Sequence, residues 1–194
     1  GARHFVCKAV KTIGEAGTVD ANGYYTYGGG SVAAVTNKNV VSVCFYGTGV
    51  KTLPDNVYQC VAPNPPSGSN GEYNVFASDT YLMFLYLPKT LTAFPKYMCQ
   101  RSSVRVVEFE DNQIAATEIV GAQSGGNSPF AFCGNLKSII IPEGIQTISN
   151  AVFRENCSLK YVKFPSTMTR LEGFSGGTGG GVFFRSNAIE TVVF

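Results

Sequence analysis

The side chains best suited to chemistry are three carboxylates close together in the chain, Glu108, Glu110 and Asp111. Paired carboxylates can transfer protons or bind calcium. In an extended segment, however, Glu108 and Glu110 lie on one side and a full pleat apart, which favours solvated charges on an exposed face. The single histidine, His4, supplies little for catalysis or metal binding. Since no nucleophile, base and orienting group can be assembled, we expect no enzyme, no metal site and no cofactor.

The cysteines and a glycine-rich run offer equally little chemistry. Free buried thiols are favoured over a disulfide framework, because the chain has no CxxC pair; the cysteines are Cys7, Cys44, Cys60, Cys99, Cys133 and Cys157. Cys133 and Cys157 are interpreted as small buried residues, and Cys44 as an exposed thiol without a basic neighbour to activate it. Residues 176–181 lack the Lys-Ser/Thr of a phosphate loop. Asn156 begins a formal glycosylation sequon at a turn that we expect to be buried.

Composition limits the class of protein. The chain has 194 residues, 44% of them hydrophobic and 14% charged, which is typical of one folded domain. Fifteen basic and thirteen acidic residues leave a net charge of +2, with no basic run denser than 160–163, so we expect no nucleic-acid partner. The apolar runs are far shorter than the ~20 residues that cross a bilayer, so we expect no membrane span.

A repeat gives the scaffold for these residues. Apolar side chains recur at positions i, i+3 and i+5, usually before a proline, and again at i+9 and i+12. The clearest unit contains Leu136, Ile139 and Ile141, then Ile145 and Ile148. Other units begin at Val40, Leu82, Val104, Leu159 and Ile189. The unit of Val104 departs from the pattern, because its second pair is Ile114 and Thr117. Before this unit, Cys99 stands where an aromatic residue is expected.

The basic period is about 22 residues, with longer gaps where residues were inserted. The insertions hold much of the glycine and proline, at 61–73, 121–128 and 172–181. The pattern resumes in phase beyond each one, which indicates loops on a continuous scaffold.

Each unit should begin with a short strand. A unit of this length cannot bury its apolar face alone, so successive strands must stack in parallel. We therefore predict a mainly β, right-handed solenoid with one parallel sheet and few or no long helices. An ordinary single-core α/β or β-sandwich domain with evenly spaced strands is the disfavoured alternative.

Residues 131–148, AFCGNLKSIIIPEGIQTI, carry the form AF, Cys, LxxIxIP and I/VxxI, and they resemble the BspA-type leucine-rich repeat. The resemblance covers about residues 39–194 and is strongest from 130 to 171. It implies a leucine-rich-repeat solenoid of about six units in one continuous domain. Members of this family are mostly bacterial surface or secreted proteins, some of them adhesins that bind host or matrix proteins. The resemblance thus implies an extracellular or cell-surface location and a non-catalytic binding function.

The two ends of the predicted solenoid differ. Residues 1–38 match the repeat poorly. Their turn signals, Asn22-Gly23 and residues 28–30, are flanked by the tyrosines at 24, 25 and 27 and by the apolar run 32–35, and they predict a hairpin-like N-terminal cap. At the other end, the unit that closes on Phe194 leaves an open edge unless the preceding loop protects it. We expect weak self-association through this edge strand.

Positions i+2 and i+4 of each strand should point out of the sheet. The candidate binding face that results contains Phe84, Tyr86, Val106, Glu108, Ile140, Tyr161 and Lys163. It is richer in large apolar side chains than solubility requires, which predicts a protein partner or, alternatively, a glycan that stacks on the aromatic rings. Such a face also arises without a ligand if these residues serve as good strand formers, or if the N-terminal segment or an insertion covers them.

Overall fold

The structure is a computed structural model, and it describes residues 3–6, 17–19, 25–27, 40–51, 82–95, 98–121, 128–173 and 180–194. Within these ranges the chain is mainly β, with no α-helix and a single 3-10 turn, η2 (Glu110–Asn112).

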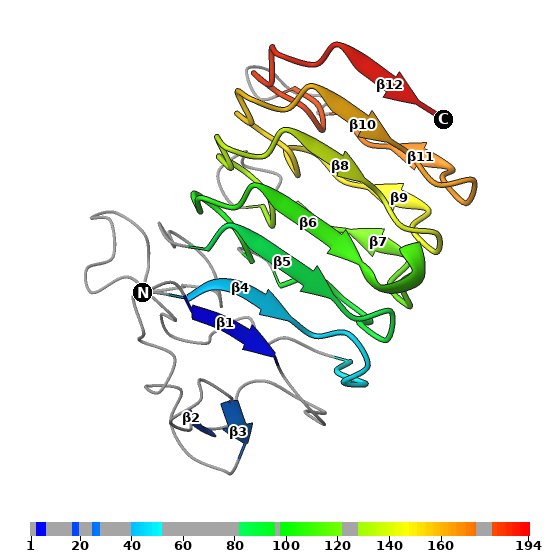
Figure 1. Cartoon of the computed structure of the whole chain (residues 1–194). Helices are drawn as coiled ribbons and strands as arrows, with labels where there is room; N and C mark the ends of the chain where they lie inside the picture. Colours follow the sequence, from blue (N-terminus) through cyan, green and yellow to red (C-terminus); the bar gives the residue numbers. More distant parts are fainter. Residues whose placement is uncertain are drawn as a thin grey trace.

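Most strands lie in one row, which we call the main row (Figure 1). Its strands are β1 (Arg3–Val6), β4 (Val40–Cys44), β5 (Phe84–Leu87), β6 (Val106–Phe109), β8 (Ser138–Ile140), β10 (Tyr161–Lys163) and β12 (Thr191–Val193). All hydrogen-bonded pairs in it are parallel, in the ladders β1-β4-β5-β6 and β8-β10-β12. β6 and β8 lie side by side where the two ladders meet.

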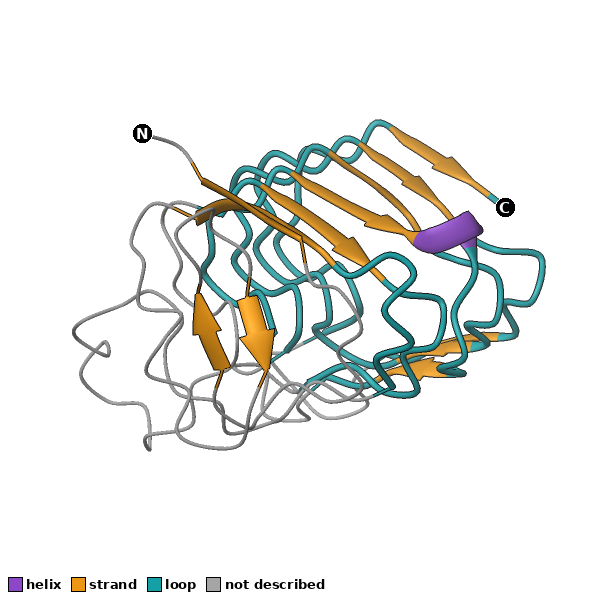
Figure 2. Ribbon diagram, turned by 60° about the horizontal axis from the view of Figure 1, so that its bottom comes forward, coloured by secondary structure: helices purple, strands orange, loops and turns teal. Residues whose placement is uncertain are grey.

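The prediction of one parallel sheet is incomplete, because a second, short row consists of β7 (Glu118–Ile119), β9 (Thr147–Ile148) and β11 (Arg170–Leu171), again parallel. Figure 2 shows this short row and the main row on opposite sides of the connecting segments. The chain therefore passes through the main row, crosses to the short row where the unit has one, and returns. We call one such passage a coil.

The apolar spacing determines what fills the space between the rows. In the clearest unit Leu136, Ile139 and Ile141 are at most 1% exposed. The parallel register places Ile139 beside Val162 and Val162 beside Val192, so the same repeat position stacks from coil to coil. The prediction that i, i+3 and i+5 point inward is confirmed for the units of Leu82, Val104, Leu136 and Leu159.

The unit of Val104 corrects one expectation. Its second inward pair is Ala116 and Ile119, 1% and 0% exposed, whereas Thr117 is exposed. Ile119 of β7 pairs with Ile148 of β9, which shows that Ala116 and Ile119 correspond to Ile145 and Ile148 of the clearest unit. The extra residues are taken up by η2, where Asp111 and Asn112 have left-handed backbone angles. Ile114, predicted as the first of the pair, is buried as well.

Phenylalanine rings stack along the coils beside this aliphatic core. The centroids of Phe130 and Phe153 are 5.4 Å apart at an interplanar angle of 8°, and those of Phe153 and Phe183 are 5.5 Å apart at 11°. Cys99, which donates its N–H to the Pro129 carbonyl, is the neighbour of this stack in the preceding coil. Phe94 packs edge-on against Phe130, at 5.9 Å, and supplies a ring where the repeat has a cysteine.

The N-terminal region differs in part from the predicted cap. β2 (Gly17–Val19) and β3 (Tyr25–Tyr27) pair antiparallel, which agrees with a hairpin in this segment, although both turn signals and the run 32–35 lie outside the described residues. β1, by contrast, pairs in parallel with β4 and so extends the main row. The division of the chain between residues 38 and 39 stays a prediction, and the insertion at 61–73 also lies outside the described residues.

At the opposite end of the main row, β12 has a neighbour on one side only in the described structure. Val192 is 44% exposed and Phe194 85%, whereas their equivalents Val162 and Phe164 are buried. Self-association through this edge stays a prediction.

Two adjacent isoleucines test the inward and outward alternation. Ile139 is 1% exposed and Ile140 45% exposed on the same strand. Ile139→Ala should lower the free energy of unfolding by about 2–5 kcal/mol, because it opens a cavity in the core. Ile140→Ala, the matched control, should change it by no more than about 0.5 kcal/mol. Urea unfolding followed by circular dichroism measures both, and equal effects would contradict the register.

Candidate functional site

The outward positions of the main row form a continuous surface, which we call the strand face: Phe84, Tyr86, Val106, Glu108, Ile140, Tyr161 and Lys163. The register pairs Phe84 with Val106 and Tyr86 with Glu108 on β5 and β6. On β8 and β10, Ile140 pairs with Lys163. β6 and β8 are neighbours in the main row (Figure 1). The alternation of burial along the strands places the predicted residues on one side of this row.

Exposure agrees with this outward placement. Glu108, Ile140 and Lys163 are exposed. The other four members, Phe84, Tyr86, Val106 and Tyr161, are half-buried, and the burial pattern alternates along β5, β6 and β10. The strand face therefore presents large apolar side chains to solvent between a carboxylate and an ammonium group.

The sequence pattern missed one neighbour of this surface, Tyr46. Its ring lies edge-on to that of Tyr86, with centroids 5.7 Å apart at 78°. Burial, and after it the charge of Glu108, raise the pKa of Tyr46 to about 12, so its phenol stays protonated and able to donate a hydrogen bond. Tyr46 directly follows the inward residue Phe45. In other units this position, just beyond the strand, holds a proline or Glu110, so the inward and outward alternation of the strands does not predict that Tyr46 belongs to the surface.

Of the three neighbouring carboxylates, Glu108 lies on the strand face, whereas Glu110 and Asp111 form contacts with other coils. Glu110 accepts the Gly47 N–H at 3.0 Å and the Lys89 N–H at 3.2 Å, and so joins three successive coils. Asp111 pairs with the Lys89 ammonium group at 2.6 Å, which raises the pKa of that lysine. No group of three or more His, Cys, Asp or Glu residues that could hold a metal ion occurs within the described ranges.

Glu143 acts on the following coil in a similar way. Its carboxylate accepts the Ser166 N–H at 3.0 Å and the Ser166 hydroxyl at 2.9 Å. These bonds stabilise the charged form and lower the pKa of Glu143 below its usual value. Carboxylates that follow main-row strands thus hold neighbouring turns together.

Cys44, Cys133 and Cys157 are free thiols, as predicted, and Cys99 is buried. Cys133 is buried, but Cys157 is exposed, so its interpretation as a buried repeat residue was wrong. The inward position belongs to the preceding residue, Asn156, which is 0% exposed. That burial agrees with the interpretation of the glycosylation sequon as a formal match only. Cys44, predicted to be exposed, is half-buried at an outward position of β4.

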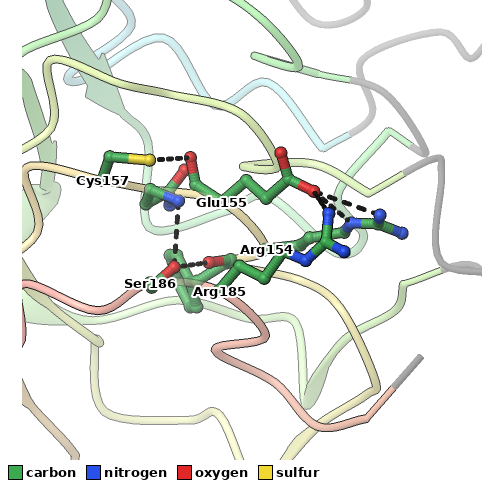
Figure 3. Close-up of polar contacts among 7 residues, drawn as sticks. Arg154, Glu155, Cys157, Arg185 and Ser186 are labelled. Atoms are coloured by element: carbon green, nitrogen blue, oxygen red, sulfur yellow. Dashed lines mark hydrogen bonds and ion pairs between the residues drawn. The ribbon is translucent and has the colours of Figure 1, made fainter. Parts of the chain in front are cut away.

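A ladder of buried polar side chains, which we call the polar ladder, runs along these turns with one member per coil: Ser102, Cys133, Asn156 and Ser186. The Asn156 side-chain oxygen accepts the Cys133 N–H at 2.8 Å. The Ser186 hydroxyl accepts the Asn156 N–H at 2.9 Å and donates to the Phe153 carbonyl at 2.6 Å (Figure 3). Each coil therefore satisfies buried backbone groups of the coil before it.

The stretch from β7 to just beyond β11 is similar to a known repeat family. A family model described as "BspA type Leucine rich repeat region (6 copies)" matches residues 119–175. Searches of curated proteins and of solved structures found no match. Among the described residues, no helix has the length and apolar character needed to traverse a bilayer.

Alkylation distinguishes the two kinds of cysteine. Burial raises the pKa of the Cys133 thiol to about 12, so it stays protonated and unreactive at mildly alkaline pH. Iodoacetamide should label Cys157 quickly in the native protein and Cys133 only after unfolding, as measured by mass spectrometry of the labelled peptides. Labelling in guanidinium chloride is the control, and equal native rates would contradict the burial of Cys133.

Proposed function

We propose that this chain, which carries a BspA-type leucine-rich repeat region, is a non-catalytic binding module. In this proposal its parallel strands form a leucine-rich-repeat solenoid of about six units. A protein partner binds to the strand face, and the buried side of each coil serves to hold that face rigid.

The exposure of apolar side chains on the strand face carries the proposal. Ile140 is 45% exposed although its neighbours on both sides in the sequence, Ile139 and Ile141, are 1% exposed. Phe84, Tyr86 and Tyr161 extend the apolar surface along the row, and Glu108 and Lys163 add opposite charges. Aromatic side chains surrounded by polar groups are typical of the centres of protein interfaces.

The chemistry of the remaining groups supports a binding role rather than catalysis. The carboxylates of Glu110 and Glu143 are engaged in hydrogen bonds that join coils. BspA-type repeats are generally non-enzymatic modules, which agrees with this assignment.

We also propose that the protein acts at the cell surface or outside the cell. The family of the matched repeat region is typically of that kind. Adhesion to a host or matrix protein is the corresponding role for an extended repeat surface.

Glycan binding is a second candidate, favoured by the pair Tyr46 and Tyr86. Two aromatic rings with centroids 5.7 Å apart, next to the Glu108 carboxylate, combine a stacking surface with a hydrogen-bond acceptor. A sugar ring needs both elements. A glycan array would identify such a ligand, and an array without signals that depend on Tyr86 would exclude this candidate.

Alanine substitution tests the protein-binding role. Tyr86→Ala and Tyr161→Ala should each weaken binding to a partner identified by cross-linking by about thirtyfold, the effect of about 2 kcal/mol per interface anchor. Leu171→Ala is the matched control, because Leu171 is 41% exposed but belongs to the short row. Surface plasmon resonance measures the affinities.

Thermal unfolding of the three variants checks that the fold is retained. If the tyrosine variants bind as tightly as the unchanged protein, or if Leu171→Ala weakens binding equally, the strand face is not the binding site.

A further inference from the structure

A second surface lies on the turns that lead into the main row, away from the strand face. Arg101, Phe132, Glu155 and Arg185 occupy the same position in successive coils, immediately before the polar ladder. All four have left-handed backbone angles, with φ of 58°, 61°, 54° and 59°. Backbone hydrogen bonds from Arg101 to Ala131, from Phe132 to Arg154 and from Glu155 to Phe184 confirm the equivalence.

Arginine and phenylalanine side chains alternate along these turns. The guanidinium carbons of Arg101 and Arg154 lie 5.0 and 5.5 Å from the centroid of the Phe132 ring. Those of Arg154 and Arg185 lie 5.2 and 5.1 Å from the centroid of Phe184. We call this set the arginine–phenylalanine ladder. The shared rings hold three like charges close together.

The ladder has more positive than negative charge. Oε1 of Glu155 accepts from Arg154 at 3.1 Å and lies 3.4 Å from Nη1 of Arg185, so that two guanidinium groups converge on one carboxylate (Figure 3). Arg101 makes its cation–π contact but no ion pair with any described residue. The Arg185 side chain is 64% exposed and that of Arg154 20% exposed.

Neighbouring residues add further positive charge. Arg105, Lys137 and Lys160 stand directly before β6, β8 and β10, and all three are exposed. Of these, Lys160 pairs with Glu190 at 2.6 Å. Among the described residues, the turns before the main row thus carry six basic side chains against two acidic ones, Glu155 and Glu190; the basic ones are Arg101, Arg105, Lys137, Arg154, Lys160 and Arg185. The side at or after the ends of the main-row strands is mixed and slightly negative: it carries Glu108, Glu110, Asp111 and Glu143 beside Lys51, Lys89 and Lys163.

We propose that the arginine–phenylalanine ladder docks an acidic segment of another polypeptide. A guanidinium group that lies over an aromatic ring can direct its N–H groups sideways, where a carboxylate accepts two of them in a fork. Because the rings already order the arginine side chains, little conformational freedom is lost when such a carboxylate binds.

The geometry favours a polypeptide over a nucleic acid. Base recognition on a basic surface uses the open faces of aromatic rings as stacking platforms. Here Phe132 and Phe184 are each half-buried and contacted by two guanidinium groups, so they hold arginines instead.

The turns do not depend on this ladder for their structure. The polar ladder already holds consecutive turns through Asn156 and Ser186. Exposed ion pairs contribute little to folding. The outer arginines, Arg101 and Arg185, can therefore be changed while the buried bonds beneath them stay in place.

Fluorescence anisotropy with labelled poly-L-glutamate tests the proposal, with heparin and oligo-deoxythymidylate as competing polyanions. The Arg101→Ser/Arg185→Ser protein should bind poly-L-glutamate about tenfold more weakly, the combined effect of two screened charge pairs. The matched control, Lys51→Ser/Arg170→Ser, removes the same charge from other exposed positions and should bind as the unchanged protein does.

Arg101→Lys/Arg185→Lys keeps the charge and removes the fork, and it should weaken binding several-fold with the fold retained. If the serine variant does not fold, the affinity of this lysine variant tests whether the guanidinium groups bind the acidic segment. The proposal is overturned if poly-L-glutamate does not bind, if the control loses as much affinity, if the lysine variant binds unchanged, or if heparin or the oligonucleotide binds more tightly at equal ionic strength.

Discussion

Every level of this structure depends on the fact that no coil can bury its own apolar side chains. Val162 is completely buried because Ile139 lies on one side of it and Val192 on the other. Val192 has the same kind of side chain in the same repeat position, yet it is 44% exposed, because no described strand follows it. The contrast shows directly that burial in this protein comes from the next coil.

The same stacking rule organises the polar groups. Glu110, Glu143, Asn156 and Ser186 all form hydrogen bonds to an adjacent coil. A buried backbone N–H without a partner would be costly, so the side chains of Asn156 and Ser186 contribute to stability by accepting the N–H groups of Cys133 and Asn156. For this reason Glu110 and Asp111, two of the three carboxylates considered for chemistry, instead connect coils.

Spacing in the sequence was sufficient to predict the strand that opens each unit and, in four units, its inward positions, but it predicted neither β1 nor the short row β7, β9 and β11. It failed where the chain length of a unit changed. The pair Ala116 and Ile119 was missed because η2 shifts the second half of that unit, and a fixed spacing cannot show where added residues are absorbed.

The turns were harder still to predict. Serine, cysteine and asparagine share one structural position in the polar ladder, since each can bond to the backbone of a neighbouring coil, and no pattern of residue type shows that they are equivalent. Cys157 was therefore placed inward where Asn156 belongs. The arginine–phenylalanine ladder was missed for a related reason: its five members, at positions 101, 132, 154, 184 and 185, are 31, 22, 30 and 1 residues apart, so no fixed spacing connects them.

The separation of charge along the strands has a consequence for how the molecule meets its surroundings. Because all main-row strands run in one direction, the positive turns before them and the slightly negative side after them give the described region an electric dipole along the strands. A negatively charged body would rotate the molecule so that the turns approach first. The strand face would then stand sideways to that body and stay accessible, so one protein could be oriented by one surface while it presents another.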